Sequence, residues 1–186
     1  MRISARKVFI AGGLVSSVLL VAVGVALIVM GVWGRSEVRS QLRSEQIYGT
    51  EDSSIAGQLV DTGAEAKVFA DTIKKHALEA AGGKTYAQLG RYLKVGGGDT
   101  NNPDEAVKDA NGNPVANPAR NTWVTATALR TALYMSYFAE QVSTFSIVMG
   151  VVLIVTGGGF GVLTLAALWR PAIVREEVTS AVPAHA

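Results

Sequence analysis

Two long apolar stretches without a charged residue dominate the hydrophobic pattern of this chain. Val8–Trp33 (26 residues) and Val142–Trp169 (28 residues) contain no Asp, Glu, Lys or Arg. A helix of about 20 apolar residues crosses the hydrocarbon core of a bilayer, and neither stretch has the polar stripe of a soluble helix. The pattern predicts an all-α membrane protein, with two transmembrane helices forming a hairpin and a mostly helical extracytoplasmic domain between them.

A cleaved signal peptide is the alternative interpretation of the first stretch, because Arg2, Arg6 and Lys7 precede it. The apolar run is longer than the roughly 7–15 residues of such a signal, and no small-x-small cleavage site follows it, so we expect an uncleaved anchor. The basic residues place the amino-terminal tail in the cytoplasm of a bacterium, since positive loops stay inside the plasma membrane. The expected order is a cytoplasmic tail over 1–7, a span over 8–33, an extracytoplasmic domain over 34–141, a span over 142–169 and a cytoplasmic tail over 170–186.

Small residues recur every seven positions in each apolar stretch. They are Ser17, Gly24 and Gly31 in the first stretch and Ser143, Gly150, Gly157 and Thr164 in the second. A seven-residue spacing keeps one helix face toward a neighbour, and small residues allow close approach of the backbones in a membrane. We expect the two rows to meet in an antiparallel pair. Gly157-x-x-x-Gly161 would then offer a second surface to another subunit.

The segment between the spans reads as helical. Residues 35–47 continue the first span, and Thr62 with Glu65 fits a capping box that starts a helix ending at Gly82-Gly83. A short helix is expected from Thr85 to the glycines at 96–98, followed by a flexible loop over 96–120. That loop has a turn at Asn111-Gly112, and no convincing strand is predicted. A last helix is expected from position 121 or 122 without interruption to Pro171.

Residues at the ends of the spans and on the outer half of the last helix are the candidate contact sites. Trp33, Glu140 and Trp169 are expected at the membrane–water interface, because Glu140 falls about two turns outside the second span. The outer half of the last helix carries Arg130 as its one charge between 123 and 138 and needs apolar neighbours or a partner. The candidate partner-surface residues are Trp123, Leu129, Leu133, Tyr134, Tyr137 and Phe138.

Composition and motifs argue against catalysis. The chain is 49% hydrophobic, carries a net charge of +2 and has no cysteine, which excludes disulfides and thiolate chemistry. Gly82-Gly83-Lys84-Thr85 lacks the first glycine of a phosphate-binding loop and follows a helix. Asp109-x-Asn111-x-Asn113 has Pro114 and Arg120 where a calcium loop needs glycine and glutamate. We therefore expect no catalytic residue, no cofactor, no metal ion and no nucleic-acid partner.

Several short runs resemble a group of small two-span membrane proteins of actinobacteria. The runs are Val38-Arg39-Ser40-Gln41-Leu42, Val60-Asp61-Thr62-Gly63-Ala64 and Gly82-Gly83-Lys84-Thr85-Tyr86-Ala87. Some members of that group carry a ring-opening dioxygenase label. Iron in such an enzyme needs several His and carboxylate ligands, and His76 is the single histidine outside the tails. The resemblance implies a compartment and an architecture, and no activity.

The sequence favours a non-catalytic two-pass plasma-membrane protein. Its expected partners are the lipid bilayer and another membrane or envelope protein, or further copies of itself. An accessory, assembly or scaffolding subunit fits this description, a respiratory complex being one conceivable host. The alternative is an extracytoplasmic sensor or ligand-binding module, with a pocket formed by the Asn-rich loop 99–118 and Tyr86, Tyr92, Trp123 and Tyr134. An enzyme is a distant third interpretation.

Overall fold

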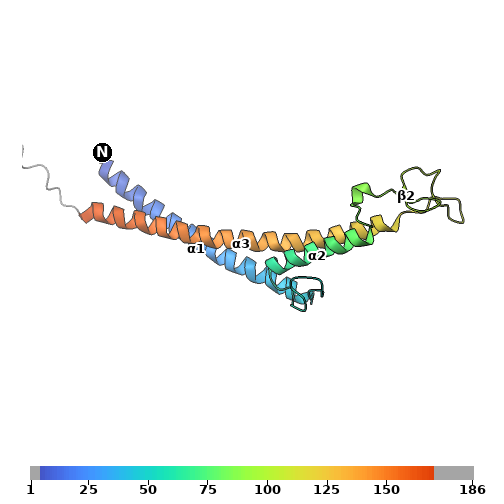
Figure 1. The fold of residues 1–186 in the computed structure, drawn as a ribbon. Coiled ribbons are helices and arrows are strands. Elements are labelled where there is room, and N and C mark those ends of the chain that lie inside the picture. The colour runs from blue at the N-terminus through green and yellow to red at the C-terminus, as the bar shows by residue number, and fades with distance from the viewer. Residues whose placement is uncertain (1–4, 170–186) are drawn as a thin grey trace, which may run out of the picture. The chain divides into compact units, whose positions relative to one another are not determined.

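The computed structural model describes residues 5–169 (Figure 1). The expected tail over 170–186, with His185, and most of the tail over 1–7 therefore lie outside the described residues. Helices dominate the described part of the chain. In order, the elements are α1 (Ala5–Ser44), α2 (Gly63–Ala80), a single 3-10 turn (Tyr86–Gln88), β1 (Tyr92–Leu93), β2 (Asp99–Thr100) and α3 (Pro118–Trp169).

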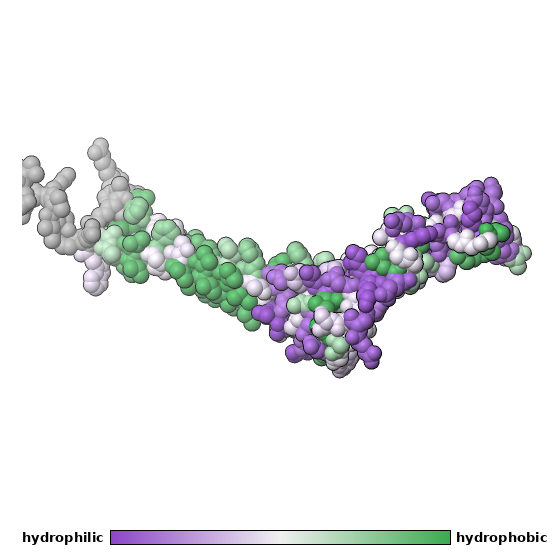
Figure 2. Space-filling view, viewed as in Figure 1, coloured by the Kyte–Doolittle hydropathy of each residue, from purple (hydrophilic) through white to green (hydrophobic). Residues whose placement is uncertain are grey.

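The chain divides into two compact units, and α1 and α3 each contribute to both of them. The first, here called the apolar unit, comprises residues 1–32 and 144–186. The second, here called the polar unit, is Trp33–Ser143. These limits fall close to the span ends expected from the distribution of charges. The visible face of the apolar unit is mostly hydrophobic, and that of the polar unit is mostly hydrophilic (Figure 2).

Helices α1 and α3 are each long and apolar enough to cross a membrane. Only 11% of the most apolar 18-residue window of each helix is buried within the protein. The core helix of a soluble protein has most of its apolar side chains buried, so this exposure suits a lipid environment better than an aqueous one. The coarse expectation of a helical protein with two candidate membrane helices is therefore confirmed.

Local sequence signals set the bounds of α2. The Thr62 hydroxyl accepts the Glu65 N–H at 3.3 Å, and the Glu65 carboxylate accepts the Thr62 N–H at 2.9 Å, which confirms the predicted capping box. The helix ends before Gly82 and Gly83, whose φ angles of 61° and 80° lie in the left-handed region that glycine tolerates. Both ends of α2 were thus predictable from neighbouring residues.

Helix α3 begins a few residues before the predicted start. The Asn117 side chain accepts the Ala119 N–H at 3.0 Å, and Pro118 occupies the first helical position. Proline suits that position because a backbone N–H at the first helical residue has no partner within the helix, and proline has no N–H. From Pro118 the helix continues without interruption to Trp169, as the sequence predicts up to Pro171.

Two small apolar clusters hold the polar unit together, and both lie between α3 and its neighbours. In the first, Leu42 of α1 and Ala66 and Ala70 of α2 surround Leu133 of α3. In the second, Ala77 of α2 and Leu89 contact Trp123 of α3. Alanine dominates the buried face of α2. Helices α2 and α3 therefore approach closely and leave room for few large side chains between them.

The short helix predicted from Thr85 to residue 96 is wrong. One 3-10 turn, Tyr86–Gln88, is followed by the antiparallel pair β1–β2, and Gly96, Gly97 and Gly98 reverse the chain with positive φ. Side-chain hydrogen bonds replace the helix there, because the Asp99 carboxylate accepts the Gly90 N–H at 2.7 Å.

The predicted turn at Asn111-Gly112 is confirmed. The Gly112 N–H donates to the Asp109 carbonyl at 3.0 Å, with a φ of 83° at Gly112. The bridge between Lys108 and Pro114 makes this turn a hairpin tip.

Candidate functional site

The small residues of the apolar unit form the contact between α1 and α3. A Cβ atom on Gly24 would lie 2.6 Å from the Gly150 carbonyl oxygen, and one on Gly150 would lie 2.5 Å from that of Gly24. Farther along, the Ser17 hydroxyl donates to the Gly157 carbonyl at 2.7 Å. Among the contacting pairs, a lower residue number in α1 goes with a higher residue number in α3. The two helices therefore run antiparallel in this unit.

The remaining members of the two rows have other neighbours. Thr164 faces Gly13, and Ser143 faces Gly34 within the polar unit, while Gly31 is buried. A Cβ on Gly161 would lie 2.8 Å from the Ser17 hydroxyl. Gly161 therefore lies on the same contact with α1 as Gly157, and it is half-buried.

A buried carboxylate joins the three helices of the polar unit. Glu140 Oε1 accepts hydrogen bonds from Arg35 Nε at 2.9 Å and Arg39 Nη2 at 3.0 Å, and Oε2 accepts the Gly63 N–H. Its side chain is 9% exposed. Gly63 is the first residue of α2, so the carboxylate also interacts favourably with the positive end of that helix dipole. We call this arrangement the Glu140 clamp.

Opposing effects set the pKa of Glu140. Burial by itself raises the pKa, since it penalises the charged form. Hydrogen bonds from the Gly63 N–H and from Arg39 and Arg35 outweigh burial and lower the pKa below the ordinary value of 4.5. The sequence alone places Glu140 in the headgroup region and does not reveal the clamp. The four-residue spacing of Arg35 and Arg39, which puts both on one helix face, is the signal that could have suggested it.

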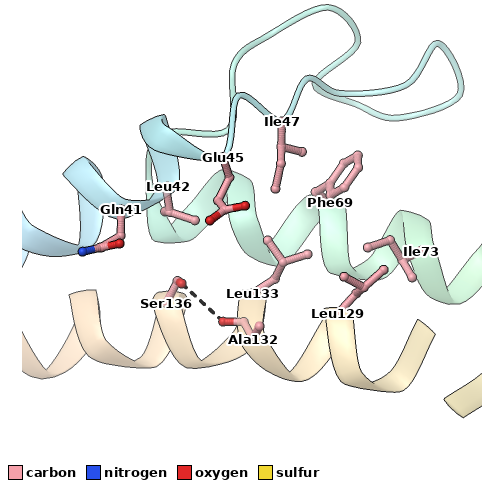
Figure 3. A pocket seen from close by; sticks show the side chains of 10 residues that line it. All are labelled: Gln41, Leu42, Glu45, Ile47, Phe69, Ile73, Leu129, Ala132, Leu133 and Ser136. Atoms are coloured by element: carbon pink, nitrogen blue, oxygen red, sulfur yellow. Dashed lines mark hydrogen bonds between the residues drawn. The ribbon is translucent and has the colours of Figure 1, made fainter. Parts of the chain in front are cut away.

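An open apolar groove runs between the end of α1, α2 and α3 (Figure 3). Its volume is about 610 Å³, within the range of about 300–1,000 Å³ that is typical of ligand pockets. Seven of its lining residues are apolar, and three are polar. The apolar residues are Leu42, Ile47, Phe69, Ile73, Leu129, Ala132 and Leu133, and the polar ones are Gln41, Glu45 and Ser136.

A second hollow of about 570 Å³ shares Ile73 and Leu129 with the first. It follows the same side of α2 and α3 toward His76 and Asn121. Because the two hollows share both walls, we treat them together as one feature, the α2–α3 groove. Its second half is more polar than its first, since Thr122 and Thr125 also line it.

The predicted partner-surface residues separate into buried and accessible ones. Trp123 and Leu133 are buried in the two apolar clusters, and Leu133 also lines the α2–α3 groove. The Tyr134 hydroxyl donates to Asp71, and the Tyr137 ring lies under the Lys67 ammonium. Leu129 and Phe138 are exposed, and Leu129 lines the α2–α3 groove.

The predicted interface residues Trp33 and Trp169 are both exposed. Three of the aromatic rings expected to form a sensor pocket have structural partners of their own. Tyr86 stacks on the Arg120 guanidinium, Trp123 donates its indole N–H to the Lys84 carbonyl, and Tyr134 bonds to Asp71.

The residues weighed for chemistry have ordinary structural partners. His76 Nε2 lies 3.0 Å from the Asp52 carboxylate, and the Lys75 hydrogen bond, ahead of those from Thr50 and His76, lowers the pKa of Asp52. The Asp109 carboxylate accepts the N–H groups of Asn111 and Asn113 within its own turn. Over residues 5–169, no group of three or more His, Asp or Glu side chains is arranged to hold a metal ion.

No protein-family model, curated protein or solved structure matches this chain. The resemblance to two-span actinobacterial proteins therefore stays a prediction from the sequence.

Proposed function

We propose that this chain is a two-span plasma-membrane protein that acts as a non-catalytic accessory, assembly or scaffolding subunit. In this proposal α1 and α3 cross the membrane as a hairpin, both termini are cytoplasmic, and the polar unit lies outside. The exposed apolar surface of both helices supports the membrane location. The close contact at Gly24 and Gly150 supports the hairpin, because helices in lipid associate through small residues.

The observation that carries the binding role is the α2–α3 groove. Leu129 is exposed on the polar unit, Phe69 and Ile73 beside it are half-buried, and the buried clusters of this unit are small. Apolar surface that is left open to water in this way offers a contact area to a partner. A partner that covers the groove removes that apolar area from water.

Co-purification tests this proposal. The full chain, isolated in mild detergent with and without the substitution Leu129→Asp, is analysed by size-exclusion chromatography and mass spectrometry. We expect one or more membrane or envelope proteins to co-purify in constant proportion. A monodisperse monomer without any companion contradicts an accessory role.

Labelling of introduced cysteines tests the orientation separately, because the chain has no cysteine of its own. Asn111→Cys in the hairpin tip should react with a membrane-impermeant maleimide in intact cells. Ser180→Cys should react only after the cells are opened. The reverse pattern contradicts the proposed topology.

A second candidate function, an extracytoplasmic ligand-binding module, is favoured by the volume of the groove. About 610 Å³ lined mainly by apolar side chains suits a small apolar molecule. Native mass spectrometry of the purified protein decides between the two, since a bound small molecule adds a constant mass. That mass should disappear in Leu129→Asp if the molecule occupies the groove.

A further inference from the structure

We propose that the α2–α3 groove receives an amphipathic helix of another protein, with a basic side chain of that helix placed against Glu45. The inference deepens the proposed function and rests on it. It names the kind of partner by its chemistry: apolar residues at positions i, i+3 or i+4, and i+7, with Lys or Arg near one end.

The dimensions of the groove fit a helix. Its α2 wall extends from Phe69 to Ala80 and its α3 wall from Asn121 to Ser136. At 1.5 Å per residue, these walls are about 17 Å and about 23 Å long, or three to four helical turns. Two parallel walls of this length with an open side are the geometry in which a third helix docks its apolar face.

The pattern of polarity along the groove also favours a helix over a lipid chain. A hydrocarbon tail would suit the half lined by Ile47, Phe69 and Leu133, but it could not use the hydrogen-bonding groups of the other half. An amphipathic helix brings polar side chains at its edges that can pair with groups such as Asn121 and Thr125. The acyl-chain alternative leaves those groups and Glu45 without a function.

The negative charge of Glu45 favours a partner helix with a basic residue near one end. Glu45 is exposed, lines the groove, and forms no ion pair or side-chain hydrogen bond with the described part of the chain. No described Lys or Arg lines either half of the groove. Arg35 and Arg39, on the helix that ends just before Glu45, are paired with Glu140. A cationic side chain from outside is therefore the complementary group.

A second copy of this chain fits the groove less well. Two copies joined groove to groove by a two-fold axis would place the same lining residues against each other. Each groove then contributes Glu45 and no Lys or Arg, so the two carboxylates would lack a cation to neutralise them. A different protein meets the charge requirement without this repulsion.

A displayed library of 18-residue helical peptides, selected against the full chain in lipid nanodiscs, tests the inference. We expect enrichment of peptides with leucine, isoleucine or phenylalanine at helical spacing and Lys or Arg near one end. An enriched peptide is then labelled, and its affinity is measured by fluorescence anisotropy. Circular dichroism confirms that each variant retains its helix content.

Four variants locate the binding. Leu129→Asp should weaken binding at least tenfold, because it puts a charge into the shared part of both hollows. Val124→Asp is the matched control, since Val124 is on the same helix and equally exposed (56% against 53%) but lines neither hollow. Glu45→Gln should weaken binding roughly two- to fivefold, the effect of an exposed ion pair. Selection against Glu45→Lys should enrich acidic residues where the original chain enriches basic ones.

Several outcomes overturn the inference. They are a selection without helical spacing, equal affinity of Leu129→Asp and Val124→Asp, unchanged charge preference on Glu45→Lys, and a lipid that blocks the groove in native mass spectra. If a partner co-purifies equally with Leu129→Asp, the inference fails while the proposed function survives. If peptides bind as expected but nothing co-purifies, the groove binds helices and the accessory role fails.

Discussion

Glu140 is the residue on which the arrangement of the polar unit depends most directly. Its carboxylate is shared between two arginines of α1 and the first N–H of α2, so one side chain of α3 holds both other helices. The arginines keep part of their contact with water, and this lowers the desolvation free energy of bringing the charges together. A charged group with three hydrogen-bond donors contributes more than a surface ion pair does.

We predict that Glu140→Ala lowers the free energy of unfolding of the polar unit by about 2 kcal/mol, since hydrogen bonds to a charged group contribute about 1.5–3 kcal/mol. Thermal unfolding of the full chain in detergent, followed by circular dichroism, measures the change. Glu79→Ala is the control, because Glu79 is exposed and its nitrogen–oxygen distance to Lys75 is 4.0 Å. Equal effects of the two substitutions would contradict the clamp.

The lowered pKa of Glu140 also predicts a pH dependence. A carboxyl group with a folded pKa below its unfolded value stabilises the folded state above about pH 4.5. That stabilisation is lost as the pH falls through the lower, folded pKa. The unfolding temperature should therefore decrease between pH 5 and pH 3, and decrease less steeply in Glu140→Gln. Parallel curves for the two proteins would show that Glu140 does not contribute.

At the scale of elements, the sequence predicted the helix ends that neighbouring residues determine. It missed the local structure that depends on contacts between residues far apart in the chain. Thr62 and Glu65 are three residues apart, so the start of α2 could be read directly. The segment after Thr85 could not, because Gly90 bonds to Asp99 and Asn117 donates to the Gly90 carbonyl. These contacts between separated residues outweigh the helical tendency of the segment.

The candidate site illustrates the same limit. Leu129 was among the expected contact residues because the outer half of α3 is apolar. The groove itself is formed by α1, Ile47, α2 and α3, and no single stretch contains its pattern. The Glu140 clamp joins residues more than 100 positions apart, so only the folded chain reveals it.

The contact between α1 and α3 at Gly24 and Gly150 can be tested by substitution. We predict that Gly150→Val destabilises the helix pair by about 1–3 kcal/mol, because the new side chain would meet the Gly24 carbonyl at a distance shorter than van der Waals contact. Gly158→Val is the control, since a Cβ there meets nothing within 4 Å. Unfolding in detergent should separate the two variants, and similar stabilities would argue against this contact.

At the scale of the whole molecule, the chain combines an apolar unit suited to lipid with a polar unit that carries an open groove. The 49% hydrophobic composition averages these two parts and describes neither. The small buried clusters of the polar unit and the exposed Leu129 have one common explanation. In our proposal, the polar unit is completed by a partner that covers the groove.

Site-specific photo-crosslinking in living cells tests that claim most directly. A photoreactive amino acid at position 129 should give a covalent product with another protein, and the attached segment should have apolar residues at helical spacing. The same amino acid at position 124 should give little or no product. Equal products at both positions, products only with a second copy of this chain, or no product at position 129 would contradict the account.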